Sequence, residues 1–269
     1  MHRRINLQTV LQKRLKRFRK RLQRLQDNAT ADNIHNFRIA CREVLACYAL
    51  LKTIGPAKRW KPFLKDALDA LDRLRDLQQM QERLLQQELL LPCVVHSTFE
   101  KPIEKATRHW LDYAPTLQAQ KFLRAIAATE KSLKSSNSLS DSLQDAFESQ
   151  WSKALHLTQK SLLAADVTDL ESLHRLRIRY KRIRYLLELL ENDISLSLHR
   201  ETLKHWQDTL GDVQDFLVMA RLAKELELPT TLRQDFLLRA EEQARYCVAQ
   251  RDILAQFLRS IDDQVRALL

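Results

Sequence analysis

Four side chains that could bind an anion follow one another at helical spacing in the second half of the chain. They are His174, Arg177, Lys181 and Arg184. At 100° per residue they share a stripe about 80° wide on one helix face. The apolar face beside this stripe consists of Leu173, Leu176, Tyr180, Ile183 and Leu187. Arginine offers planar forks of donors, lysine a point charge, and histidine a donor whose charge rises beside a phosphate. The pattern therefore predicts a site for anionic oxygens at the border of a helical core.

The same stripe recurs 139 positions earlier in the chain. At this shift the aligned pairs are His35 with His174, Arg38 with Arg177, Arg42 with Lys181, Asp69 with Asp208, Asp76 with Asp215 and Met80 with Met219. A lone basic run is most simply a solvated face, but a solvated face has no reason to place histidine at the same point twice. The gap-free repetition predicts a duplication, with repeats at 1–133 and 141–269 that together form one domain over 1–269.

Carboxylates also repeat, along the next predicted helix of each copy. Asp69, Asp72 and Asp76 stand at i, i+3 and i+7, and the second copy has Asp208 and Asp215. Such carboxylates could share a divalent cation, or pair with the arginines opposite and fix their orientation. We expect the pairing role and no metal site. The first predicted helix of each copy adds cations seven residues apart, which we include in the predicted anion site: Arg14, Arg21, Lys153 and Lys160.

Helices must position these side chains, because apolar residues recur at helical spacing along nearly the whole chain. Nine helices are predicted, at 3–27, 32–53, 58–90, 96–113, 117–133, 141–164, 169–191, 196–227 and 231–268. Gly55-Pro56 and Pro229 end two of them, and Thr168 with Glu171 predicts a capping box for the seventh. The Ser-rich stretch 132–141 predicts a linker at the middle of the chain.

Composition excludes several classes of protein. The chain has 2 glycines and 6 prolines, which disfavours sheet-rich folds, and the isolated Gly55 and Gly211 exclude glycine-rich dinucleotide and phosphate loops. The net charge of +11 would attract polyanions. No apolar run has the length of a membrane span, and the 4 cysteines form no C-x-x-C pair. We expect a cytoplasmic protein with buried, reduced thiols, no cofactor and no membrane partner.

The repeated motifs resemble the conserved-histidine α-helical domain family, CHAD. The resemblance rests on residues 34–42, 71–76, 173–185 and 210–215 and covers nearly the whole chain. It implies an all-α fold of two pseudo-symmetric antiparallel helical bundles around a basic central channel, binding of inorganic polyphosphate, and a role at polyphosphate granules. The contacts implied by position are His35, Arg38, Arg42, His174, Arg177, Lys181, Arg182 and Arg184. The first copy departs from the family pattern, with Glu43 and Leu45 at commonly basic positions and Asp72 at the usual glycine.

Polyphosphate agrees with the composition, because it has no base to stack and the chain contains 7% aromatic residues. The enzyme alternative is a triphosphatase with the signature Glu-x-Glu-x-Lys; Glu225 and Glu227 are followed by Leu228 and Pro229, without the lysine. We therefore predict binding without catalysis. Nucleic-acid binding stays the alternative, because the basic first helix would serve on any phosphate backbone. No motif specifies an oligomeric state.

Overall fold

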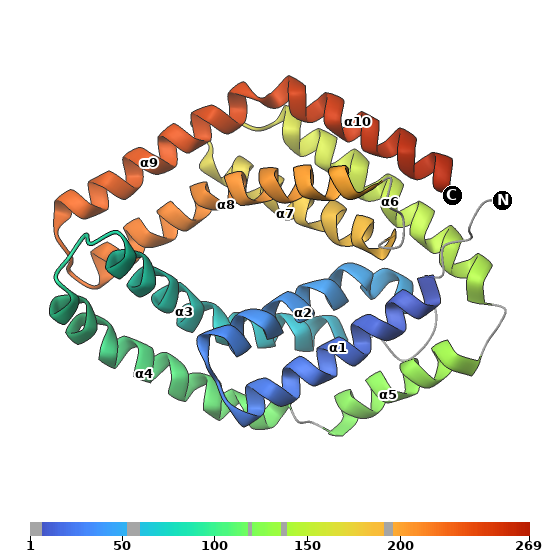
Figure 1. Cartoon of the computed structure of the whole chain (residues 1–269), viewed down its shortest axis with the longest axis horizontal. Coiled ribbons are helices and arrows are strands. Elements are labelled where there is room, and N and C mark those ends of the chain that lie inside the picture. The colour runs from blue at the N-terminus through green and yellow to red at the C-terminus, as the bar shows by residue number, and fades with distance from the viewer. Residues whose placement is uncertain (1–6, 53–59, 118–119, 136–138, 191–195) are drawn as a thin grey trace. The chain divides into compact units, whose positions relative to one another are not determined.

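The computed structural model describes residues 7–52, 60–117, 120–135, 139–190 and 196–269, and all regular structure within these ranges is helical (Figure 1). The prediction of an all-α fold is therefore confirmed. The α-helices are α1 (Leu7–Asp27), α2 (Ala31–Leu51), α3 (Trp60–Gln86), α4 (Pro92–Leu117), α5 (Gln120–Ser135), α6 (Leu139–Leu163), α7 (Leu170–Leu187), α8 (Ser197–Glu225), α9 (Thr230–Ala249) and α10 (Arg251–Leu268). A short 3-10 helix, Glu188–Leu190, follows α7.

The chain divides into two compact units. The N-terminal unit, Gln8–Leu139, holds α1 to α5, and the C-terminal unit, Ser140–Leu269 together with Met1–Leu7, holds α6 to α10. In the N-terminal unit α3 packs against α2 and α4, and in the C-terminal unit α8 packs against α7 and α9. Short turns join α3 to α4 and α8 to α9, so each of these pairs is antiparallel (Figure 1). The duplication into repeats 1–133 and 141–269 stays a prediction.

The buried apolar stripes of α2 and α3 recur in α7 and α8 at the shift of 139 found in the sequence. In α2 the buried residues include Ile34, Phe37, Cys41 and Val44, and in α7 they include Leu173, Leu176, Tyr180 and Ile183. The 3,4 spacing of these residues keeps one face of each helix against the core. The helices α3 and α8 repeat the pattern, for example at Leu71 and Leu210. Both histidine helices are therefore held by their apolar faces, which leaves the neighbouring basic stripe at the edge of the core.

The turns after α3 and α8 have the same backbone geometry. Glu88 has φ of 50° and Glu227, 139 positions later, has φ of 53°. The amide of Leu89 donates to the Leu84 carbonyl at 3.1 Å, and the amide of Leu228 donates to the Ala223 carbonyl at 2.9 Å. This is a helix C-terminus in which a left-handed residue, usually glycine, reverses the chain. In this chain glutamate takes that position in both turns, and the left-handed conformation of a residue with a Cβ atom costs about 1 kcal/mol in each.

One predicted helix is in fact two. The expected helix 231–268 ends at Ala249 and restarts at Arg251, with Gln250 between them at φ −89° and ψ 10°. Neither glycine nor proline stands at this break. The direction changes because the two helices pack on different neighbours: α9 lies against α8, whereas α10 bonds α6 through Asp262, which accepts from the Trp151 indole at 3.0 Å.

Three smaller expectations are corrected by the structure. The cap of α7 is Asp169, which accepts from the Ser172 amide at 3.2 Å, whereas Thr168 bonds Asp166. Cys93 is exposed, while the other three cysteines are buried. The expected linker is largely helical, since α5 runs to Ser135 and α6 starts at Leu139. Gly55-Pro56 lies outside the described residues. Within the described part of the chain, each helix is too short or too polar to span a bilayer.

Candidate anion-binding site

The basic stripe of α7 lies at the rim of the C-terminal unit's core. Leu173, Leu176 and Tyr180 are buried, and they hold the helix so that His174, Arg177, Lys181 and Arg184 are each half-buried. From the first to the last of these four residues the helix rises about 15 Å. The stripe thus presents a row of partly desolvated donors, where an ionic contact is screened less than on an open surface.

Arg177 lies over the glycine of the neighbouring helix. A Cβ atom at Gly211 would stand 3.2 Å from Nη2 and 3.5 Å from Nε of Arg177. The guanidinium is also 3.5 Å from Asp215, one turn further along α8. Because Gly211 has no side chain, the guanidinium of Arg177 lies close to the backbone of α8. Among the described residues, its one ion pair is the loose contact with Asp215.

Three nitrogens of this stripe are buried without a hydrogen-bond partner among the described residues. They are His174 Nδ1, Arg177 Nε and Arg184 Nε. A buried polar atom that bonds nothing costs about 1–3 kcal/mol. All three lie on one helix face. An anion with several acceptor oxygens in a row would satisfy them together.

Arg184 and Arg182 also make contacts with other side chains of the protein. Arg184 Nη1 donates to Glu188 at 2.8 Å, and its guanidinium stacks 4.7 Å from the centre of the Tyr185 ring. Arg182 donates to Gln150 of α6 at 2.6 Å, and burial, followed by the charge of Arg179, lowers the pKa of Arg182. Arg182 therefore points toward α6 rather than along the stripe.

The stripe of α2 differs in its key arginine. Arg38 is buried, donates to the Leu68 carbonyl at 3.3 Å, and forms an ion pair with Asp72 of α3. At the shift of 139, Asp72 aligns with Gly211. The carboxylate thus occupies the place that Gly211 leaves open beneath Arg177. The first stripe has an arginine already neutralised by the protein, while Arg42 lies half-buried nearby.

His35 experiences strong positive charge. Partial burial of its imidazole, followed by the charges of Arg75, Arg42 and Arg38, lowers the pKa of His35 below the ordinary 6.5, against a smaller opposing effect of Asp32. The residue still exposes much of its surface. Arg75 was not among the predicted site residues, although it belongs to the motif Leu71–Asp76. Burial and the surrounding arginines thus both favour the neutral form of the His35 imidazole.

The predicted cations of the first helices do not occupy equivalent places. Arg14 is buried, with its Nη1 3.3 Å from the Cys47 sulfur, whereas Lys153 is exposed. Likewise Arg21 is half-buried, 3.9 Å from Glu43, and Lys160 is exposed. The reason is a register difference of one residue. Buried residues of α1 recur in α6 at a shift of 140: Leu11 with Trp151, Leu15 with Leu155, Phe18 with Thr158, Leu22 with Leu162 and Leu25 with Ala165.

The predicted supporting carboxylates fall into two groups. Asp215 pairs with Arg177, and Asp76 is half-buried on α3, whereas Asp69 and Asp208 are exposed. Asp72, which was not among the predicted supporting residues, makes the direct ion pair with Arg38. Its spacing from Asp69 and Asp76 in the sequence was the available signal. Among the described residues, no group of three or more His, Cys, Asp or Glu side chains is arranged to hold a metal ion.

These helices and their motifs match one family of domains. The sequence profile of the CHAD domain aligns with residues 9–224, which include both histidine stripes and both carboxylate helices. The chain belongs to the CHAD family. A crystal structure of the CHAD domain from the plant Ricinus communis superposes with a TM-score of 0.62 at 18% identity, covering 98% of this chain and 91% of that chain. That likeness shows the shared fold. None of the curated proteins matches this chain.

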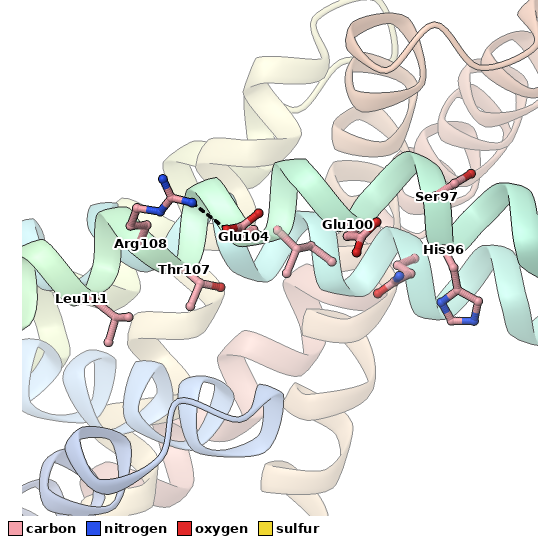
Figure 2. A pocket seen from close by; sticks show the side chains of 9 residues that line it. His96, Ser97, Glu100, Glu104, Thr107, Arg108 and Leu111 are labelled. Carbon is pink, nitrogen blue, oxygen red and sulfur yellow. Dashed lines mark hydrogen bonds and ion pairs between the residues drawn. The ribbon is translucent and has the colours of Figure 1, made fainter.

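In this CHAD protein, the hollow drawn in Figure 2 belongs to the N-terminal unit. It runs along α4, where His96, Glu100 and Glu104 follow one another and Arg108 donates to Glu104 at 2.6 Å. Its lining contains no residue of the predicted anion site. The hollow mixes both signs of charge on an open helix surface, so it offers no converging set of donors comparable with the CHAD stripes.

Proposed function

We propose that this CHAD protein binds inorganic polyphosphate, without catalysis, through the His/Arg/Lys stripes of α2 and α7. The observation that carries the proposal is the row of three buried nitrogens without partners on His174, Arg177 and Arg184. A linear phosphate chain lying along α7 would place acceptor oxygens beside each of them. The family relationship supports the same class of ligand.

The charge of the chain supports a polyanion rather than a small neutral ligand. The sequence carries 45 Lys and Arg against 34 Asp and Glu. Arginine binds phosphate oxygens in pairs, and the half-buried position of Arg177 strengthens each contact. The described residues at these stripes offer donors and charge rather than stacking rings, which favours phosphate without bases over single-stranded nucleic acid.

The two units suggest how the site arose. The buried residues of α2 and α3, the φ of 50° and 53° at the turns, and the paired histidines recur at a shift of 139, and we infer that a helical unit was duplicated. The central channel, the pseudo-symmetry and the role at polyphosphate granules stay predictions.

A competition titration tests this function. Long-chain polyphosphate and duplex DNA are compared at equal phosphate concentration and at two salt concentrations. We expect polyphosphate to bind at least about tenfold more tightly, with an affinity that falls steeply as salt rises, because each neutralised phosphate releases a counterion. No free phosphate should be released, with or without Mg²⁺. Equal affinity for DNA would instead support the nucleic-acid alternative, and phosphate release would contradict a purely binding role.

Affinity should also depend on pH through His35. In the free protein, partial burial and then the neighbouring arginines lower the pKa of His35, and a bound phosphate chain would raise it again. Binding then takes up a proton, so affinity rises as the pH falls through the pKa of the bound state and levels off once His35 is charged in the free protein as well. The measurement is calorimetry in two buffers of different ionisation enthalpy.

His35→Gln should remove this proton uptake, whereas His96→Gln, an exposed histidine on α4, should leave it intact. Undiminished proton uptake in His35→Gln would show that another group carries the pH dependence.

A further inference from the structure

A second basic surface lies on α1, on the side that faces α5. There the two helices border a groove of about 900 Å³ within the N-terminal unit. The groove is built by contacts across the pair: Gln12 donates to the Leu133 carbonyl at 2.8 Å, and Arg19 bonds Glu130 at 2.6 Å. We call it the α1–α5 groove. Its described lining includes no residue of the α2 or α7 stripe.

The lining of this groove is strongly cationic. Lys13, Lys16 and Lys20 line it from α1, and Lys134 lines it from α5. Among the described lining residues the one carboxylate is Glu130, and Arg19 already neutralises it. Like charges at this spacing destabilise a helix and repel one another across the groove. A bound anion would replace this repulsion between the lysines with attraction between each lysine and the anion.

The arginines and lysines of α1 have separate surroundings. Arg14 contacts Cys47, and Arg17 and Arg21 lie 3.5 Å and 3.9 Å from the buried Glu43 of α2. The packing of α1 on α2 thus accounts for these arginines. Lys16 and Lys20 are exposed and line the groove instead. Compact ammonium groups at the mouth of a groove are suited to anionic oxygens.

An unsatisfied amide group at the end of the groove also indicates a ligand. Gln26 Nε2 is buried and has no acceptor among the described residues, although the side chain lines the groove. The described lining contains amide, hydroxyl and ammonium donors and no aromatic ring. Such a surface can bond phosphate oxygens and offers no platform for stacking a base.

We propose that the α1–α5 groove is a second phosphate-binding site, which takes a short linear polyphosphate segment independently of the stripes. The ligand class rests on the proposed function, whereas the site rests on the groove itself. Between Lys13 and Gln26 the helix α1 rises about 20 Å, which gives room for several phosphates in a row.

Lysine protection tests this site in the full chain. The protein is acetylated with a limiting amount of an amine-reactive ester, with and without tripolyphosphate, and modification at each lysine is measured by mass spectrometry. We expect tripolyphosphate to slow modification of Lys16, Lys20 and Lys134 at least about threefold, because phosphate contacts occupy the ammonium groups. Lys61 and Lys65, exposed on α3, are the internal control and should react unchanged.

The same experiment in Arg177→Ala, Lys181→Ala separates the two proposals. Protection of the groove lysines should persist in this variant while its overall affinity for polyphosphate falls. If the stripe variant loses affinity but the groove lysines are never protected, the groove inference is wrong and the proposed function stands. If the groove is protected and the stripe variant binds like the parent, the groove inference stands and the stripe function is wrong. Protection by a single-stranded oligonucleotide equal to that by tripolyphosphate would overturn the ligand class.

Discussion

Replacing Arg177 and Lys181 together by alanine is expected to lower polyphosphate affinity at least about 100-fold, whereas replacing Arg38 and Arg42 lowers it about tenfold. A desolvated charge-assisted contact contributes about 1.5–3 kcal/mol, and about 1.4 kcal/mol corresponds to a tenfold change. Arg177 has one loose ion pair at 3.5 Å, and on the proposed function Arg177 and Lys181 both contact the ligand. Arg38 is already paired with Asp72, so the second variant removes mainly the contribution of Arg42.

The measurement is a fluorescence or calorimetric titration with long-chain polyphosphate, preceded by thermal melts of each variant. Melts are needed because loss of Arg177 leaves Asp215 without this ion pair, and loss of Arg38 leaves Asp72 of α3 without its own. The matched control is Arg239→Ala with Arg245→Ala, which removes two charges from α9, where Asp235 and Glu241 pair with them. A folded Arg177→Ala, Lys181→Ala protein that binds like the control would show that the α7 stripe is structural.

The second large effect concerns the residue beneath each arginine. Gly211→Asp should lower affinity at least about tenfold, because a carboxylate there would meet the guanidinium of Arg177, 3.2 Å from the position of the new Cβ. Conversely, Asp72→Gly should raise affinity by about tenfold, because it frees Arg38 and removes a negative charge from the first stripe. Together, the two substitutions place a carboxylate beside the arginine of the α7 stripe and remove the carboxylate beside the arginine of the α2 stripe.

Two controls separate charge from backbone effects. Gly211→Ala adds the Cβ without the charge, so Arg177 shifts by a few tenths of an ångström and affinity should change by less than about threefold. Asp72→Asn removes the charge without the helix penalty of glycine, which is about 1 kcal/mol. Both are measured by competition for one labelled polyphosphate. Unchanged or weaker binding in folded Asp72→Gly would show that the ion pair does not limit the first stripe.

The local patterns of the sequence were enough to predict the helices that carry the stripes. A helix places residues three and four apart on one face, so the buried faces of α2 and α7 follow from Ile34, Phe37 and Cys41 and from their counterparts at Leu173, Leu176 and Tyr180. The shift of 139 that joins His35 to His174 also extends to the left-handed turns at Glu88 and Glu227. Periodicity and repetition are local properties of the chain, and no tertiary contact is needed to detect them.

Tertiary packing determines which cations are buried or paired with carboxylates of the protein itself. Arg14 and Lys153 belong to helices with the same kind of stripe, yet a one-residue difference in register buries the first and exposes the second. Arg38 and Arg177 align in sequence, but the side chain on the neighbouring helix, Asp72 or Gly211, determines whether the guanidinium is neutralised. The bend at Gln250 likewise has no signal in the sequence, because it results from α9 and α10 packing on different helices. Residue types and spacing determine which groups share a helix face, while burial and charge pairing depend on what the neighbouring helix places within a few ångströms.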